Sequence, residues 1–264
     1  MVALVPGMPG TLRGPPARRK PEIRPRPSPK RIERPRSAPA DSPFVKPLLY
    51  RHIIWDWNGT LLDDVDYCIG IMNGVLRRRQ MAEMDRSAYH AIFDFPVQVY
   101  YDRLGFDPTR DSFHELSVEF ISGYDAHRWD CTLHSAATKT LAAVQAAGAT
   151  QSILSAYRDA TLKEIVGHFG LTRHFSHLAG LDDIYAHSKT ELGRAQVAAL
   201  GIAPNEIVLI GDTVHDLEVA RELGVACVLV SAGHHPAERL RRHHDCVLDS
   251  LAELPTVPGL SFLA

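Results

Sequence analysis

Four short segments of this chain carry residue types that can bind a cation and an anion. Asp56-Trp57-Asn58-Gly59-Thr60 follows one apolar run, and Gly211-Asp212-Thr213 follows another, with Asp216 one helical turn later. Ser155-Ala156 follows a third apolar run, and Lys189 lies in the connection after a fourth. Carboxylate oxygens bind hard divalent cations, whereas a hydroxyl, an ammonium group and glycine-opened turns can hold an anion.

The elements around these segments predict that the segments meet. From residue 50 onward, short β-branched-rich runs alternate with helical patterns, which is typical of βαβ units and of a parallel sheet covered on both faces. The expected strands span 52–56, 151–155, 177–181, 206–212, 225–231 and, more weakly, 245–248, and the expected helices span 135–147, 159–169, 188–200 and 216–223. Ligands of such a sheet bind beyond the carboxyl ends of its strands, so one edge should collect all four segments.

Residues 64–134 break the alternation. They contain helical patterns at 65–79, 86–93, 97–104 and 111–126 and no convincing buried strand. A helical insertion directly after the first strand predicts a separate cap. The expected division of the folded part is therefore an α/β core at 48–63 and 135–264 and a helical cap at 64–134.

Residues 1–47 have the composition of a disordered, Pro- and Arg-rich extension. They hold twelve of the eighteen prolines and eleven Lys or Arg against three acids, a net charge of +8, whereas the remaining eighteen bases and twenty-eight acids give −10. Such a segment buries too little apolar surface to offset its ordering entropy. A polybasic arm or a proline-rich ligand stays an alternative, but the acidic remainder argues against nucleic-acid binding by the core.

Other sequence features exclude some classes of protein. The apolar runs are much shorter than a membrane span, which argues against a transmembrane protein. The four cysteines form no CxxC pair, which argues against a zinc ribbon or a disulfide scaffold and predicts a cytoplasmic location.

Each segment of the candidate site also has a simpler explanation. Asn58-Gly59 is typical of a hairpin turn, Asp212 or Ser155 can serve as a helix N-cap, and a single lysine such as Lys189 usually lies at the surface. The agreement of four strand-end segments in one order favours a site over four coincidences.

That order resembles the haloacid dehalogenase-like hydrolase superfamily, from about residue 52 to the end of the chain. The family motif DxDGT appears here as Asp56 to Thr60, the second-motif Ser or Thr as Ser155, and the third-motif lysine as Lys189. The acidic motif GDxxxD appears as Gly211 to Asp216, and the helical insertion occupies the place of the first-type cap. Segment 93–97 and Tyr100-Tyr101 resemble the phosphoglycolate-phosphatase-like subgroup.

The resemblance implies an α/β fold with a Rossmann-like parallel sheet and an inserted α-helical cap. It implies a Mg²⁺-dependent phosphatase that hydrolyses a small, phosphoglycolate-like phosphorylated metabolite through an aspartyl-phosphate on Asp56. Asp216 would orient the metal shell or fix Lys189. The residues that the resemblance assigns are Asp56, Asn58, Ser155 and Lys189 for catalysis, Gly59, Thr60, Ser155, Ala156 and Lys189 for phosphate binding, and Asp56, Asn58 (through its backbone carbonyl), Asp212 and Asp216 for the metal.

Asn58 departs from the family pattern. The usual residue there is an aspartate that protonates the leaving group, and an amide cannot exchange a proton near neutral pH. Loss of such a group typically costs about 10²–10⁴-fold in rate. Three explanations stay open: a good leaving group such as an acyl or aryl phosphate, a substitute among Asp63, Asp64 and His234, or a weak or inactive phosphate-binding relative.

Other branches of the superfamily match less well. Phosphonoacetaldehyde hydrolases need a cap lysine and residues 64–134 contain none, dehalogenases need no acidic pair, and mutases depend on the acid–base residue that Asn58 replaces.

Several conspicuous residues are predicted to be structural. The pairs at His234-His235 and His243-His244 are expected on the surface or in loops, and Arg77-Arg78-Arg79 on a solvated helix face. The aromatic cluster of Phe93, Phe95, Tyr100 and Tyr101 is expected to pack within the cap. The alternative is that one of the arginines, or Arg103, meets a substrate carboxylate.

Overall fold

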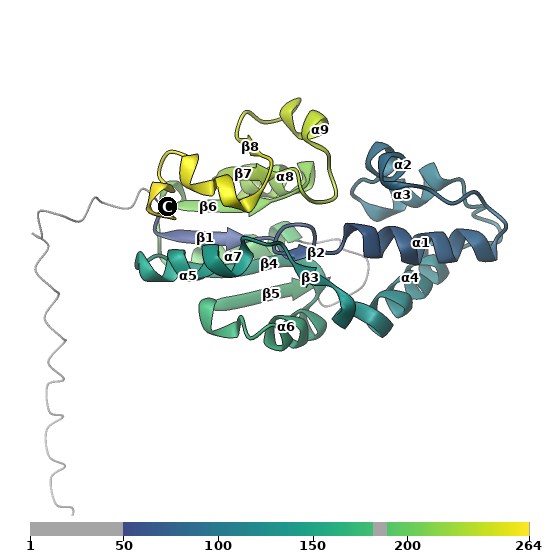
Figure 1. The fold of residues 1–264 in the computed structure, drawn as a ribbon, viewed down its shortest axis with the longest axis horizontal. Helices are drawn as coiled ribbons and strands as arrows, with labels where there is room; N and C mark the ends of the chain where they lie inside the picture. Colours follow the sequence, from purple (N-terminus) through teal and green to yellow (C-terminus); the bar gives the residue numbers. More distant parts are fainter. Residues whose placement is uncertain (1–49, 182–188, 264) are drawn as a thin grey trace, which may run out of the picture. The chain divides into compact units, whose positions relative to one another are not determined.

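A computed structural model describes residues 50–181 and 189–263; the predicted extension at 1–47 lies outside the described residues. The fold is built on a six-stranded sheet in the order β5-β4-β1-β6-β7-β8, with every pair parallel (Figure 1). The six predicted strands are confirmed as β1 (His52–Trp55), β4 (Thr150–Arg158), β5 (His177–Leu181), β6 (Ile207–Gly211), β7 (Ala226–Val230) and β8 (Val247–Leu248). The α/β fold class is therefore confirmed.

Both faces of the sheet are buried because successive side chains of each strand point to opposite sides. Ile53 and Trp55 of β1 join the larger core cluster with the apolar faces of α5 (Ala137–Ala146) and α6 (Asp159–His168). Ile54 points the other way and packs with α7 (Lys189–Leu200) and α8 (Val214–Leu223). The chain ends in short helices beside the core: α9 (Ala237–Arg241), η4 (Leu251–Thr256) and η5 (Ser261–Leu263).

The helical cap is inserted between two very short strands. β2 (Leu62–Asp63) and β3 (Thr132–Leu133) pair antiparallel where the chain leaves and re-enters the core. Between them lie α1 (Val65–Arg78), α2 (Arg86–Ile92), α3 (Val97–Leu104), α4 (Phe113–His127) and η1 (Arg128–Asp130). The cap has its own apolar cluster, built on Val65, Met72, Leu76, Tyr89 and Leu116. The residue at which cap becomes core stays a prediction.

Two local features differ from the expected elements. β4 does not end at Ser155 but continues to Arg158, with a shift of its register against β5 between Leu154 and Arg158. β2 and β3, and the single-turn helices η2 (Thr172–His174) and η3 (Pro204–Glu206), are too short to leave a periodic pattern in the sequence. Among the described helices, none has the length and apolarity that crossing a bilayer requires. The cytoplasmic location stays a prediction.

Candidate active site

Asp56 and Lys189 meet in the interior although they are far apart in the chain. Asp56 directly follows β1 and is 7% exposed, and Lys189 begins α7 and is 4% exposed. The Lys189 ammonium donates to Oδ1 of Asp56 at 2.5 Å and to Oδ1 of Asp216 at 2.6 Å. The simpler explanation of Lys189 as a surface residue is therefore wrong.

The acidic segment after β6 places two further carboxylates beside this pair. The N-cap of α8 is Thr213, so Asp212 is not the helix cap. Thr213 and Asp216 form a capping box, and Oδ2 of Asp216 also accepts from the backbone N–H groups of Asp212 and Thr213 at 3.2 and 3.0 Å. The ammonium of Lys189 donates to the other oxygen of Asp216, a contact that matches the role of fixing Lys189.

The turn after β1 supports Asp212 rather than forming a hairpin. β1 pairs parallel with β4 and β6, which excludes the hairpin explanation of Asn58-Gly59. Gly59 has a φ of +72°, and a Cβ there would lie 2.3 Å from Oδ2 of Asp212, so the position requires glycine. Thr60 donates from its hydroxyl to Oδ1 of Asp212 at 2.8 Å. The expected contacts of Gly59 and Thr60 with phosphate stay predictions.

The three carboxylates fit a divalent cation. One oxygen each of Asp56, Asp212 and Asp216 lie within 4.8 Å of one another, all three residues are buried, and one ammonium group contacts two of them. Burial raises the pKa of Asp56 to about 8 although Lys189 lowers it, and burial raises the pKa of Asp212 to about 6. Burial acts the same way on Asp216, but the Lys189 ammonium brings its pKa down to about 2. An all-oxygen donor set with excess negative charge suits Mg²⁺.

Ser155 and Ala156 line the same cavity from β4. Ser155 is 1% exposed, and its hydroxyl accepts a hydrogen bond from the backbone N–H of Tyr157 at 3.1 Å. Helix α6 begins only at Asp159, so Ser155 is not its cap. The register shift of β4 falls between Leu154 and Arg158, the stretch from which Ser155 and Ala156 line the cavity.

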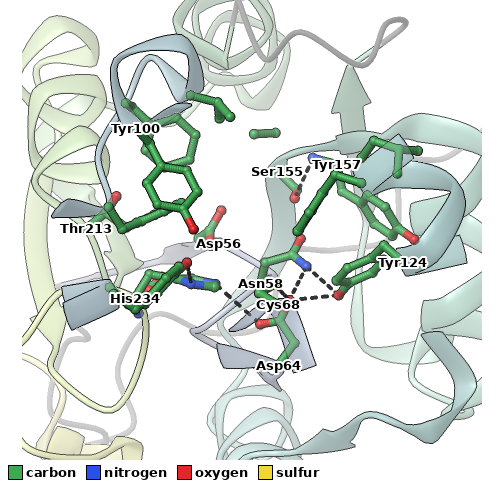
Figure 2. A pocket seen from close by; sticks show the side chains of 18 of the residues that line it. Asp56, Asn58, Asp64, Cys68, Tyr100, Tyr124, Ser155, Tyr157, Thr213 and His234 are labelled. Carbon is green, nitrogen blue, oxygen red and sulfur yellow. Dashed lines mark hydrogen bonds and ion pairs between the residues drawn. The ribbon is translucent and has the colours of Figure 1, made fainter. Parts of the chain in front are cut away.

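A cavity of about 160 Å³ lies above these groups. Asp56, Asn58, Ser155, Asp212 and Asp216 line it from the core, and residues of α2, α3 and α4 line it from the cap. In Figure 2, Tyr100 stands on one side of the pocket and Tyr124 and Tyr157 on the other, with Asp56 between them. The cap aromatics, predicted to be packing only, both pack in the cap cluster and line this cavity.

The Asn58 side chain is held by a hydrogen-bond network. Its Nδ2 donates to Oδ2 of Asp64 at 2.7 Å and to the Tyr124 hydroxyl at 2.9 Å, and that hydroxyl donates to Oδ2 of Asp64 at 2.7 Å (Figure 2). The backbone N–H of Gly59 donates to the other Asp64 oxygen at 2.8 Å. Burial raises the pKa of Asp64, but hydrogen bonds from His234, Asn58 and Tyr124 bring it below its usual range.

His234 completes this network; it lies in a loop, as one of the two predicted alternatives has it, but it is not at the surface. His234 and His235 are 6% and 0% exposed. The His234 ring contacts the Tyr89 hydroxyl through Nδ1 at 2.7 Å and Asp64 through Nε2 at 3.4 Å, and its backbone N–H donates to Asp212 at 2.7 Å. Burial lowers its pKa, but the Asp64 carboxylate raises it to about 9.

The sequence held a signal for His234 but none for the tyrosines. His234 comes shortly after the carboxyl end of β7, so the strand-end rule also reaches it. Tyr89 and Tyr124 sit in cap helices at spacings that core packing explains equally well.

The cap arginines do not reach the cavity. Arg77 and Arg78 are exposed ion pairs, as predicted, whereas Arg79 is only 20% exposed in its side chain and pairs with Asp111 and Glu119. Arg103 pairs with Asp94 at 3.1 Å.

Comparisons with known proteins agree with this geometry. A family model described as haloacid dehalogenase-like hydrolase matches residues 53–230, which is more than half of the chain. The chain is 29% identical over 202 residues to a 5'-nucleotidase of Pseudomonas aeruginosa, covering 74% of this chain and 89% of the nucleotidase. It is also 25% identical to the tyrosine-protein kinase PtkA of Mycobacterium tuberculosis, covering 81% of this chain and 74% of PtkA.

Solved structures share the fold. A crystal structure described as a predicted phosphoglycolate phosphatase from Haemophilus somnus superimposes with a TM-score of 0.65 at 19% identity, covering 80% of this chain and 98% of that one. The chain therefore belongs to the haloacid dehalogenase-like hydrolase family, and it is a hydrolase of the phosphatase type.

Proposed function

We propose that the protein is a Mg²⁺-dependent phosphatase that hydrolyses a small phosphorylated metabolite through an aspartyl-phosphate on Asp56. The observation that carries this proposal is the position of Asp56: it lines a cavity, accepts a hydrogen bond from Lys189 and lies next to Asp212. The phosphoglycolate-like substrate expected from the sequence stays a prediction.

The chain's own groups divide the work of phosphoryl transfer. Oδ1 of Asp56 accepts from Lys189, while Oδ2 has only a 3.4 Å contact with the Thr60 hydroxyl and is the freer oxygen to attack phosphorus. Lys189 neutralises charge beside the transferred group, and Ser155 lies where it can hold a phosphoryl oxygen. Water then splits the aspartyl-phosphate and regenerates Asp56.

In this proposal the oxygens of Asp56 and Asp212 and the backbone carbonyl of Asn58 would hold a divalent cation. When bound, Mg²⁺ would reduce the repulsion between the Asp56 carboxylate and a phosphate dianion. Asp216 would act through Lys189, whose ammonium donates to its Oδ1 at 2.6 Å.

Asn58 defines the chemistry that the site lacks. Its amide donates hydrogen bonds to Asp64 and Tyr124, but it cannot give up a proton to a leaving group near neutral pH. Of the three expected substitutes, Asp63 is exposed in β2, whereas Asp64 and His234 line the cavity. Asp64 accepts a hydrogen bond from the Asn58 amide, and the His234 ring in turn contacts Asp64.

A second candidate is a phosphate-binding relative with little turnover. The Asn58 amide favours this candidate, because it is held by Asp64 and Tyr124 and position 58 has no carboxylic acid. Such a protein would keep the cation and the ligand but release no product.

The experiment is a screen of phosphorylated metabolites for phosphate release, with Mg²⁺ and with EDTA. We expect Mg²⁺-dependent release that the Asp56→Asn variant loses. Tight ligand binding without release, in the presence of Mg²⁺, would favour the second candidate and contradict the first.

A further inference from the structure

The end of the cavity away from Asp56 is lined by aromatic rings. Phe93 and Tyr100 pack edge-to-face with centroids 5.3 Å apart, and Tyr100 and Tyr101 follow at 5.7 Å. Across the cavity, Tyr124 and Tyr157 pack at 5.4 Å (Figure 2). These rings come from α3, α4, β4 and the residue that follows α2, and they line one space.

The hydroxyl groups of these tyrosines are already engaged. Tyr157 donates to Asp125 at 3.0 Å, Tyr124 to Asp64, and Tyr101 bonds with Ser117. The hydroxyl of Tyr100 contacts the sulfur of Met84 at 3.7 Å. What the rings offer a ligand is therefore mainly apolar and π surface, which favours an aromatic partner.

The lining has no partner for a substrate carboxylate. Among the described residues around the cavity, His234 is the only basic side chain, and it already faces Asp64. No arginine of the cap lines the cavity, and residues 182–188 contain neither lysine nor arginine. Carboxylates of Asp56, Asp64, Asp212 and Asp216 line the same space and would repel a second anionic group.

The cavity has room for a ring. An engineered apolar cavity of about 150 Å³ holds a benzene molecule. The cavity here, which includes the space beside Asp56, measures about 160 Å³ and is partly open to solvent.

Asn58 points independently to the same class of leaving group. Without an acid at position 58, an alkyl ester would have to release an unprotonated alkoxide, which is costly. A phenol has an ordinary pKa of about 10, so its phenolate leaves more easily without protonation. An aryl phosphate is therefore the ester that this site handles with the least help.

We propose that the substrate is a phosphate ester of a small, uncharged aromatic alcohol of the phenol type, with its ring between Tyr100 and Tyr157. This proposal rests on the proposed phosphatase function. The bond from Asp56 to phosphorus forms as the bond from phosphorus to the phenol oxygen breaks. The electron pair leaves with that oxygen, which takes its proton from water, and a second water releases phosphate from Asp56.

Binding of phosphonates tests the ring site without any leaving-group chemistry. The test compares the affinities of benzylphosphonate and phosphonoacetate by calorimetry, on the full chain with Mg²⁺. Burial of one ring predicts that benzylphosphonate binds at least about tenfold more tightly. Equal affinities, or tighter phosphonoacetate, would overturn the proposal.

A matched pair of variants on α4 sharpens the test. Ile121 lines the cavity, whereas Val118 on the same helix is 41% exposed. Ile121→Arg should reverse the preference toward phosphonoacetate, and Val118→Arg should leave it as in the wild type. The melting temperature of each variant shows whether it folds, and a folded Ile121→Arg protein with an unchanged preference contradicts the proposal.

Turnover separates this inference from the function on which it rests. We measure kcat/KM for phenyl phosphate and for phosphoglycolate and expect the first to be at least about 100-fold larger. Release of phosphate with phosphoglycolate preferred would overturn the aryl substrate and leave the phosphatase intact. If neither ester nor any other in the screen is turned over while benzylphosphonate still binds more tightly, the proposed function fails and the ring site stands.

Discussion

The two edges of the parallel sheet bury polar side chains in different ways. At the amino edge, His52 is 0% exposed, and its ring nitrogens contact the hydroxyls of Thr150 and Ser152, both at 2.7 Å. Gln151 beside it accepts from the Trp55 indole and donates to a backbone carbonyl. These groups are neutral, and each has its partner within the chain.

At the carboxyl edge the partners do not balance. Asp56, Asp212 and Asp216 are buried around the single ammonium of Lys189. A fold needs its buried polar groups paired, and burying unbalanced charge is costly. The excess of negative charge at one edge therefore marks the place where the protein requires a ligand, while the saturated amino edge serves the fold alone.

The largest expected effect comes from the nucleophile. Asp56→Asn keeps the shape of the side chain but removes the charge that attacks phosphorus, so kcat should fall by at least about 10⁴-fold. Steady-state phosphate release measures it. Asp66→Asn, whose native side chain is 79% exposed and pairs with Arg86, is the control and should keep wild-type activity.

A second test removes the ammonium group of Lys189. Lys189→Met leaves Asp56 and Asp216 buried without their partner and should cost about 3–5 kcal/mol in the free energy of unfolding. Urea denaturation without Mg²⁺ measures the change. Lys163→Met breaks an exposed pair with Asp159 and should cost less than about 0.5 kcal/mol. Similar losses in both variants would contradict the contrast between the buried and the exposed pair.

A third test exchanges an amide and a carboxylate. Asn58→Asp alone places a carboxylate 2.7 Å from Asp64, so we combine it with Asp64→Asn, which restores one amide–carboxylate pair. The double variant should hydrolyse alkyl phosphates about 10²-fold faster than the wild type. If an aspartate at position 58 gives no gain in either background, the role assigned to that position is wrong.

The smallest effect tests the amino edge through pH. Burial lowers the pKa of His52 from its ordinary 6.5 to about 4, so the unfolded chain binds a proton more readily than the folded one. His52 thus contributes its full stability above pH 6.5 and loses it as the pH falls toward 4. From pH 7 to pH 5 we expect a loss of about 2 kcal/mol that His52→Gln lacks. His177→Gln, at the exposed start of β5, should keep the wild-type slope.

The core side of the candidate site could largely be predicted from the sequence. The strands and the edge that gathers Asp56, Ser155, Lys189 and Asp212 follow from short apolar runs and from a general property of parallel sheets. The sequence does not show that Thr213 rather than Asp212 is the N-cap of α8, because the choice between neighbouring residues depends on where the backbone becomes helical.

The cap side of the site could not be predicted in this way. Tyr100 and Tyr124 recur at helical spacing, and that spacing alone does not distinguish packing from lining a cavity. Only the fold shows that Tyr124 and Asp64, sixty residues apart, close on the amide of Asn58.

The most direct test of the account looks for phosphate on Asp56 itself. The protein is mixed with excess phenyl phosphate and Mg²⁺, quenched in acid within a single turnover, reduced with borohydride and digested for mass spectrometry. An aspartyl-phosphate on residue 56 becomes homoserine, and the account predicts this product at Asp56 and nowhere else. Phosphate released with Asp56 unmodified at every quench time would contradict it.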